Sequence, residues 1–359
     1  MKNKAIVCIL INLIIVISLL AIVAYNVIYV DPYMHYHYPH TDKYFYTLTN
    51  ERSMNDGIMR HFDYDTVVTG TSMTENFKTS EVDEIFGGKS VKVPFSGGTY
   101  KEIDSILRTG YKSGKEIRTV IRCLDYNRLV DDKDAMRYDL GRYPAYLYNN
   151  TIIDDEEYLF NRELLFGTVH SMKSSHSQSK FQPGITSFDK YANWMKGQKF
   201  GRDAVYENEE IAQNVNVRQS SNTADELEKV SANVEQNVVE LAKEHPETTF
   251  YLFFSPYSIA YWQDSLGKGV FNKHIEAEKC AIEQMLECEN IYLFSFDTNL
   301  ELTANLDNYK DSRHYGEWVN TWMLEEMKNE RYRLTKENYL TYLKDKEEKY
   351  VQYDYTSMN

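Results

Sequence analysis

The longest apolar stretch of the chain lies at its start. Residues 5–30 contain no charged side chain, and Lys2 and Lys4 precede them. A helix of this length spans a bilayer with some tilt, and the stretch exceeds the apolar region of about 7 to 15 residues in a typical signal peptide. We therefore expect an uncleaved anchor. A cleaved signal peptide is the alternative, which the lack of a clear small-x-small site before Tyr25 disfavours. The positive-inside rule predicts a cytoplasmic N-terminus and an extracellular remainder, in a cell membrane crossed once.

Beyond about residue 60, the apolar positions alternate between two patterns. Short runs rich in β-branched and aromatic residues predict buried strands, and stretches with apolar residues every three or four positions predict helices. One of these helices begins at Thr223, which fits a capping box with Glu226. Strand, helix and strand in this order imply right-handed parallel crossovers. The pattern thus predicts a doubly wound α/β sheet of about five parallel strands, at 66–69, 90–95, 117–126, 248–258 and 291–297.

The regular pattern is interrupted between about residues 127 and 222. A structureless loop of this length is improbable in a compact domain, so we expect an inserted subdomain or lid with short helices. Tyr143, Tyr146 and Tyr148 are candidates for a sugar-binding surface, because their rings can stack on a sugar. Ordinary packing within the insertion is the commoner use of such tyrosines, and it remains the alternative.

Charge and composition exclude some functions. The formal net charge of −14 disfavours nucleic-acid binding. Three histidines, His35, His37 and His40, follow the apolar stretch and could ligate a metal, but no carboxylate or cysteine completes a site by spacing. Aromatic residues just outside a membrane usually lie at its interface, and we favour that interpretation. We predict no metal site and no cofactor.

The candidate chemistry lies in two short motifs that are far apart in the chain. Ser72 follows Gly70 at the end of the first predicted strand. Ligands bind at that edge of open α/β sheets, so Ser72 is either a nucleophile or a helix cap. Asp311 precedes His314 by three residues, just before a predicted helix. Such an Asp can accept the Nδ1 proton of the His and stabilise the imidazolium that forms when Nε2 takes a proton from a serine. The D-x-x-H pattern alone is common, but its place after the last strand favours a triad.

Together these motifs resemble the SGNH (GDSL-like) hydrolase superfamily. The resemblance rests on Gly70-Thr71-Ser72 after the first strand, Gly97 after the second, and Asp311-x-x-His314 before the final helix. The stretch "GTSMTENF" is similar to a membrane-anchored cell-surface branch that includes proteins related to the teichoic-acid D-alanylation factor and the alginate O-acetylation proteins. The resemblance covers roughly residues 60 to 330, with the insertion poorly matched. It implies a flavodoxin-like three-layer αβα fold.

The resemblance also implies a role for each residue that matches a motif. Ser72 would be the nucleophile, His314 the general base and Asp311 its orienter, with the amides of Ser72 and Gly97 facing the oxyanion. The third block of the family usually contains Gly-x-Asn-Asp, whereas this chain has "CLDYNRL". Asn127 is the candidate for the missing side-chain donor. Asp125, in the same block, is the candidate for a structural role.

The expected function is that of a bacterial cell-surface O-acyltransferase, with acetyl as the expected acyl group. The resemblance implies a membrane-bound O-acyltransferase as the partner that supplies the acyl group, and a cell-wall or capsular glycan as the acceptor. A carbohydrate esterase with the same triad and a non-catalytic scaffold that binds a glycan or a synthase are the alternatives. The predicted organisation is a cytoplasmic end at 1–4, an anchor at 5–30, a stalk at 31–60, an SGNH-like domain at 61–330 with the insertion at about 127–222, and a Tyr/Lys/Glu-rich extension at 331–359.

Overall fold

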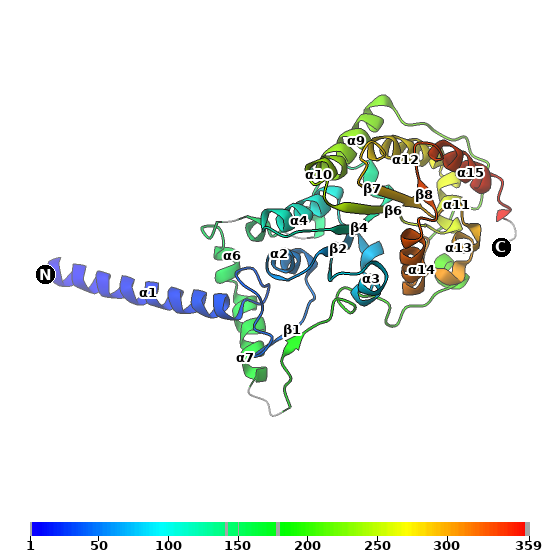
Figure 1. Cartoon of the computed structure of the whole chain (residues 1–359). Helices are drawn as coiled ribbons and strands as arrows, with labels where there is room; N and C mark the ends of the chain where they lie inside the picture. The colour runs from blue at the N-terminus through cyan, green and yellow to red at the C-terminus, as the bar shows by residue number, and fades with distance from the viewer. Residues whose placement is uncertain (1, 141–142, 150, 177–179, 356–359) are drawn as a thin grey trace. The chain divides into compact units, whose positions relative to one another are not determined.

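The computed structural model describes residues 2–140, 143–149, 151–176 and 180–355, and it divides the chain into two compact units (Figure 1). Unit 1 comprises Met1–Phe62 and Pro144–Ser187, and unit 2 comprises Asp63–Tyr143 and Phe188–Asn359. The predicted insertion is therefore divided between the two units, because only its middle part joins unit 1. The residues predicted as a juxtamembrane stalk, 31–60, belong to unit 1.

Unit 1 is built around the apolar helix α1 (Lys2–Val30). The stretch Lys4–Val30 is long and apolar enough to cross a membrane or to act as a signal sequence. Its side chains are exposed as far as residue 22, and the last two turns pack against short helices of the same unit. The other elements of unit 1 are β1 (Phe45–Tyr46), α2 (Glu51–His61), η3 (Ala145–Tyr148), α6 (Glu156–Leu159), the π-helix η4 (Leu164–Val169), α7 (His170–His176) and β5 (Gly184–Ile185).

A buried carboxylate closes the end of α1. Asp31 accepts hydrogen bonds from the amides of His35 at 3.0 Å, Tyr36 at 2.7 Å and His37 at 3.1 Å, and from the Tyr158 hydroxyl at 2.7 Å. Burial raises the pKa of Asp31, although these donors act against that effect. Because Tyr158 lies on α6, the Asp31 side chain connects the two chain segments that form unit 1.

The three histidines after α1 make separate contacts. The His35 ring lies between two buried aspartates, with Nδ1 3.5 Å from Asp56 and Nε2 3.6 Å from Asp155. Both ring nitrogens of His37 hydrogen-bond to backbone carbonyls, and the His40 ring lies 4.7 Å from the His37 ring. Within the described ranges, no three His, Cys, Asp or Glu side chains are arranged to hold a metal ion.

Unit 2 contains a six-stranded sheet with the order β3-β2-β4-β6-β7-β8. The first five strands in this order are parallel, and β8 joins β7 in the antiparallel sense. The predicted α/β class with a mainly parallel sheet is therefore confirmed. The strands are β2 (Thr66–Gly70), β3 (Ser90–Pro94), β4 (Thr119–Leu124), β6 (Thr249–Phe254), β7 (Ile291–Ser295) and β8 (Arg333–Leu334).

Helices cover both faces of this sheet (Figure 1). The connection from β2 to β3 runs one way along the sheet and that from β3 to β4 runs the other way, so right-handed crossovers place α3 and α4 on opposite faces. The first face carries α3 (Thr79–Phe86) packed against α14 (Glu317–Lys328). The second carries α4 (Tyr100–Lys112), α9 (Ala224–Val234) with η5 (Glu235–Val239) and α10 (Glu240–Glu244), and α12 (Phe271–Met285).

The C-terminal residues that were predicted as an extension are part of unit 2. After β8, α15 (Tyr339–Val351) packs against α11 (Ile259–Gly267) and α12. Lys346 of α15 is fully buried and forms ion pairs of 2.7 Å with both Glu278 and Asp297, which are fully buried as well. The Lys346 ammonium also lies 4.2 Å from the centre of the Trp262 ring. The sequence of α15 is mostly polar, yet its buried Lys346 occupies a position in the core of unit 2.

Candidate active site

The three sequence blocks lie at the carboxyl ends of three neighbouring strands. Ser72 follows β2, Gly97 follows β3 on one side, and Asn127 follows β4 on the other side. The turn after β2 requires glycine, because Gly70 has φ +151° and a Cβ there would lie 2.7 Å from the Cβ of Cys123. A small residue at this point lets Ser72 emerge at the edge of the sheet where ligands bind in α/β folds.

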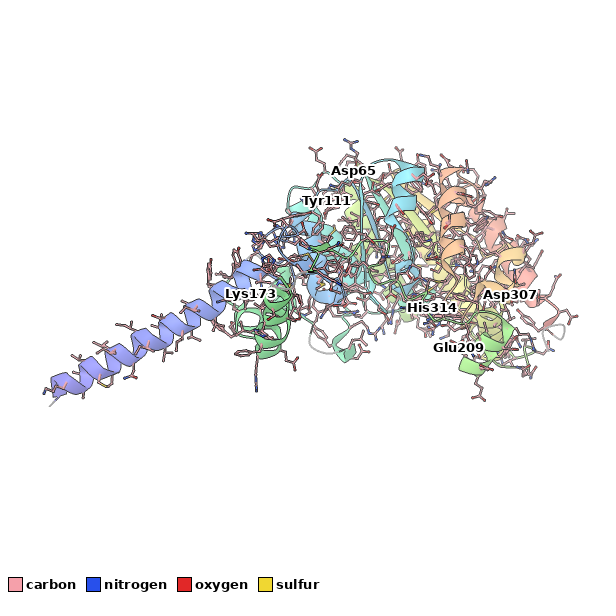
Figure 2. All side chains as sticks on the ribbon, turned by 90° about the horizontal axis from the view of Figure 1, so that it is seen from below. Asp65, Tyr111, Lys173, Glu209, Asp307 and His314 are labelled. Carbon is pink, nitrogen blue, oxygen red and sulfur yellow. The ribbon has the colours of Figure 1, made fainter. Side chains whose placement is uncertain are left out.

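Ser72, His314 and Asp311 form a hydrogen-bonded chain. Ser72 Oγ lies 2.8 Å from His314 Nε2, and His314 Nδ1 lies 2.8 Å and 2.9 Å from the two carboxylate oxygens of Asp311. An ionised Asp311 accepts the Nδ1 proton, which leaves Nε2 free to accept the proton of the serine hydroxyl. The geometry is that of a nucleophile, a general base and the group that orients it. His314 is labelled in Figure 2.

Thr71, and not Ser72, is the residue that caps the following helix. Thr71 is the N-cap of the short helix η1 (Ser72–Thr74), and its hydroxyl accepts a hydrogen bond from the amide of Met73. The Ser72 hydroxyl is directed to His314 instead. A cap would not require a histidine 2.8 Å from its oxygen, so the geometry favours the nucleophile.

The carboxylate of Asp311 is strongly held in its ionised form. Burial alone would raise its pKa, but the hydrogen bond and the charge of His314, together with the amides of His314 and Arg313, lower the pKa of Asp311 from 3.8 to about 2. The side chains of Asp311 and His314 are 18% and 19% exposed. Asp311 therefore remains a proton acceptor at any pH at which the protein is expected to work.

This shift predicts a pH-dependent contribution to stability. Because the folded pKa lies below the unfolded one, the contribution of Asp311 is fully present above about pH 4 and is lost as the pH falls toward 2. An Asp311→Asn variant is expected to lose about 2 kcal/mol of unfolding free energy at pH 6 and to approach the wild type only at about pH 2. Urea unfolding of both proteins across this range measures the difference. A difference that does not change with pH would contradict the assigned pKa.

The three groups that were predicted to bind the oxyanion are two backbone amides and one side-chain amide. Within the described ranges, the N–H groups of Ser72 and Gly97 and the Nδ2 of Asn127 have no hydrogen-bond acceptor. The Asn127 Oδ1 accepts a hydrogen bond of 2.9 Å from the Tyr261 hydroxyl, which fixes the orientation of the carboxamide. The oxyanion roles of Ser72, Gly97 and Asn127 stay predictions.

The loop that carries Gly97 is held by an arginine. Arg137 Nη1 donates to the Gly97 carbonyl at 2.5 Å, while its Nε and Nη2 bind the two carboxylate oxygens of Asp139 at 2.7 Å and 2.8 Å. Gly97 has φ +57°, and a Cβ there would lie 2.5 Å from the same Nη1. The left-handed backbone favours glycine at this position, whereas the arginine tip could move away from a Cβ.

Asp125 has the structural role that the sequence left open for it. Its carboxylate caps α5 (Tyr126–Leu129) through the amide of Asn127 at 3.0 Å. It also accepts hydrogen bonds from the Tyr257 hydroxyl at 2.6 Å and from Thr71 Oγ1 at 3.2 Å. Asp125 thus connects the ends of β2, β4 and β6 just behind the serine.

One residue beside the triad was not predicted. The Trp194 indole Nε1 donates to the Ser72 carbonyl at 3.3 Å, and the indole lies perpendicular to the His314 ring with 5.6 Å between their centres. The Lys310 ammonium lies 4.1 Å from the centre of the Trp194 ring. The Trp194 amide donates to Asn76 Oδ1, which links this loop to the "GTSMTENF" motif. Trp194 lies in the aperiodic stretch, so no sequence pattern singled it out.

The three tyrosines of the predicted sugar-binding surface are divided between the two units. Tyr143 is 5% exposed, and a ring with so little exposure offers no face on which a sugar could stack. This burial favours the packing alternative, and a role for Tyr143 in substrate binding stays a prediction. Tyr146 and Tyr148 belong to unit 1, in η3, and the Tyr148 hydroxyl donates to the backbone carbonyl of Arg52. A role for Tyr146 in substrate binding stays a prediction.

Two cavities flank the loop that carries Asp311 and His314. One, of about 480 Å³, is lined by Asn127, Ser312 and Arg313 among others. The other, of about 500 Å³, is lined by Lys310 and Asp311 among others. Both volumes lie in the range of about 300 to 1,000 Å³ that is usual for small-ligand sites. Residues of the loop that carries Asp311 and His314 thus line two cavities of this size, one of which also includes Asn127.

Comparisons with known proteins give little further information. No family model matches the chain, and no curated protein matches it. A solved structure described as "a putative platelet activating factor" from Streptococcus pneumonia is similar over 77% of this chain and 88% of that chain, with 10% sequence identity and a TM-score of 0.38. A similarity at this level supports no functional conclusion. The function is therefore argued from the site.

Proposed function

We propose that this chain is a membrane-anchored serine acyltransferase of the SGNH type, which acts through an acyl-enzyme intermediate. The observation that carries the proposal is the chain of hydrogen bonds from Ser72 through His314 to Asp311, with distances of 2.8 Å at both links. The strand order β3-β2-β4-β6-β7 supports the flavodoxin-like part of the proposal, because it is the order 2-1-3-4-5 when these strands are counted along the chain.

The first half of the proposed reaction forms the acyl-enzyme. His314 Nε2 takes the proton of Ser72 as Oγ attacks the carbonyl carbon of the acyl donor. The carbonyl oxygen gains the negative charge and is stabilised by the amides of Ser72 and Gly97 and by Asn127 Nδ2. When the tetrahedral intermediate collapses, the bond to the leaving oxygen breaks and His314 returns the proton to that oxygen.

The second half transfers the acyl group to the acceptor. A hydroxyl of the acceptor takes the place of the leaving group, and His314 removes its proton as the oxygen attacks the ester carbon. Collapse of the second intermediate returns the proton to Ser72 Oγ. Asp311 remains ionised throughout and stabilises the imidazolium in both halves.

The acceptor is proposed to be a hydroxyl of a cell-wall or capsular glycan, and the acyl group is proposed to be acetyl. An anchored enzyme outside the membrane needs a partner that passes the acyl group across the bilayer, and a membrane-bound O-acyltransferase would fit this need. The net charge of −14 favours a neutral glycan over a phosphate-rich polymer.

A carbohydrate esterase is the second candidate. Its support is the partial exposure of Asp311 and His314, at 18% and 19%, which leaves the triad open to water. If water takes the place of the glycan hydroxyl, the same sequence of steps hydrolyses an ester. The two activities therefore differ in the acceptor and not in the catalytic residues.

A fluorophosphonate probe tests whether Ser72 is an activated nucleophile. The wild-type protein is expected to be labelled, and the Ser72→Ala variant is expected to lose the label completely. Ser96→Ala is the matched control, because Ser96 is an exposed serine next to Gly97 and it should leave labelling unchanged. A folded wild-type protein that remains unlabelled would favour a non-catalytic scaffold.

Acylation of the surface glycan distinguishes the transferase from the esterase. In cells that carry the Ser72→Ala variant at normal protein level, the transferase proposal expects reduced glycan acylation and the esterase expects increased acylation. Unchanged acylation, together with labelled wild-type protein, would mean that the substrate is not this glycan.

A further inference from the structure

Unit 1 contains a groove beside the end of α1 that the proposed chemistry does not use. Its volume is about 890 Å³, which is at the upper end of the range for small-ligand sites. Pro32 and Tyr33, which follow α1 directly, line one part of this juxtamembrane groove. The remaining lining comes from the segment around β1, from α2, from the helical segment formed by η4 and α7, and from residues 180–182 before β5.

The length of α1 places this groove near the surface of a bilayer. The exposed part of α1, residues 4–22, is about 28 Å long at about 1.5 Å per residue, close to the thickness of about 30 Å of the hydrocarbon core. The following two turns are held by unit 1, where Lys173 donates to Asn26 Oδ1 and Lys43 donates to the Tyr29 hydroxyl at 3.1 Å. With α1 in a bilayer, these turns lie among the lipid head groups, beside the labelled Lys173 of Figure 2.

The groove has one helical wall that carries hydroxyl groups. Thr168, Ser171, Met172 and Ser175 line it, and their spacing of three, one and three residues places them on one face of the η4–α7 helix. This helix begins with a π-helical turn, a conformation that is rare and is found mostly at functional sites. The opposite lining includes aromatic rings and the thioether of Met54.

The charge in the groove opposes that of the whole chain. Lys180 is the one charged side chain among the described residues that line the groove, whereas the chain carries a net charge of −14. An ammonium group and several hydroxyl donors suit the oxygens of a phosphate. Met54 and Met172 can adapt to an alkyl chain, because their side chains are flexible and polarisable. The lining therefore fits an amphiphile with an anionic head.

An exposed aromatic side chain lies next to the groove. Phe166 on η4 is 69% exposed, and the adjacent residues Gly167 and Thr168 line the groove. Because η4 packs against α1, Phe166 lies at the level of α1 that meets the head groups. Aromatic side chains are enriched at this level of membranes, where they contact lipid. The groove and the bilayer are thus neighbouring surfaces.

We propose that the juxtamembrane groove binds one membrane lipid with an anionic phosphate head group. The phosphate would contact Lys180 and the hydroxyls of Ser171 and Ser175, and the first part of an acyl chain would lie along Tyr33, Met54 and Met172. The lipid enters from the leaflet on the unit 1 side of α1. This site is independent of the proposed acyl transfer, because it lies within unit 1 and Ser72 lies in unit 2.

Photocrosslinking in nanodiscs tests the proposal with the full-length protein. The probe is phosphatidylglycerol with a diazirine on one acyl chain, and the comparison probe is phosphatidylcholine with the same chains. The phosphatidylglycerol probe is expected to label peptides within residues 164–182 in addition to α1, and more strongly than the comparison probe. Labelling of α1 alone, or equal labelling by both probes, would overturn the proposal.

Two variants and one control locate the site. Ser171→Phe places a ring in the groove and is expected to remove the labelling of residues 164–182 while that of α1 remains. Ser174→Phe is the matched control, because Ser174 is an exposed serine of α7 that does not line the groove. Lys180→Glu is expected to lower labelling by phosphatidylglycerol by about fivefold or more, since one lysine near a membrane surface contributes about that factor. Equal loss in Ser174→Phe and Ser171→Phe would overturn the proposal.

A final arm distinguishes a lipid from free phosphate. Excess inorganic phosphate is added at constant ionic strength, and the expected result is unchanged labelling by the lipid probe. Loss of labelling under this condition would indicate that the groove binds free phosphate, and it would overturn the proposal that the groove binds a lipid. Fluorophosphonate labelling of Ser72 is measured in the same samples, so that failure of the groove and failure of the proposed function are separate results.

Discussion

Replacing Asp311 with asparagine is expected to lower kcat/KM for 4-nitrophenyl acetate by about 10⁴-fold, the size of the effect when the same change is made in a serine protease triad. A carboxamide can donate to His314 Nδ1, which favours the tautomer that carries its proton on Nε2. That tautomer cannot accept the proton of Ser72, although every heavy atom of the site remains in place. The measurement is ester hydrolysis by the purified full-length protein at neutral pH.

Asp307→Asn is the matched control for this experiment. Asp307 is an exposed aspartate a few residues before the loop that carries Asp311 and His314, and both Asp307 and His314 are labelled in Figure 2. The control is expected to hydrolyse the ester at the wild-type rate. A loss of less than tenfold in the folded Asp311→Asn variant would show that Asp311 does not orient the base.

Replacing Lys346 with methionine is expected to lower the unfolding free energy of unit 2 by about 3 to 5 kcal/mol. The change leaves Glu278 and Asp297 buried without their cation, although the Tyr126 hydroxyl still contacts both carboxylates. Burial already raises the pKa of Glu278 and of Asp297 in the presence of Lys346. Without the lysine these pKa values rise further, so the folded variant binds protons more readily and the loss becomes smaller as the pH falls.

Lys344→Met provides the comparison for the buried lysine. Lys344 lies on the same helix with its side chain 76% exposed, and its pairing with Glu348 spans 3.6 Å. Its replacement is expected to change stability by less than about 0.5 kcal/mol. Denaturant unfolding, followed by tryptophan fluorescence, measures both variants at pH 5 and pH 8. Equal effects of the two changes would contradict the role of the buried cluster.

The five parallel strands of unit 2 could be predicted because both faces of the sheet are covered, whereas the short antiparallel strand β8 was missed. Covered strands consist of nearly continuous β-branched and aromatic residues, and each of the five predicted runs overlaps a strand of the structure. The capping box of Thr223 and Glu226 was also predicted, and both of its hydrogen bonds are present. Local signals of this kind depend on residues a few positions apart.

Buried charges in the same sheet could not be predicted. Lys92 lies in the middle of β3 with no exposed surface, and its Nζ donates to the carbonyls of Glu75 and Phe77. Arg122 in β4 is equally buried and donates to the carbonyl of Asn237. The partners are backbone oxygens distant in sequence, and a carbonyl oxygen has no signature in the amino-acid sequence.

At the candidate site, too, the residues within short sequence motifs could be predicted, and a contact made by a distant loop could not. Ser72 and the pair of Asp311 and His314 were identifiable because each lies in a short motif at a strand end or before a helix. Trp194 was missed because its contact with His314 is made by a loop without periodicity. The role of Tyr143 could not be decided from the sequence, because stacking on a sugar and packing in a core require the same residue type, and its burial favours packing.

Unit 1 is made from two separate parts of the chain, and this limits how the protein can be made and cut. Residues 1–62 cannot complete their unit until Pro144–Ser187 has been synthesised, while the intervening residues belong to the other unit. Unit 2 in turn cannot complete its buried ion pairs until Lys346, which lies close to the C-terminus, has been synthesised and pairs with Glu278 and Asp297. Neither unit can therefore finish folding early during translation. A fragment that begins at residue 63 would also leave 144–187 without the segments on which it packs, so removing residues 1–62 is expected to unfold more of the chain than the residues that are removed.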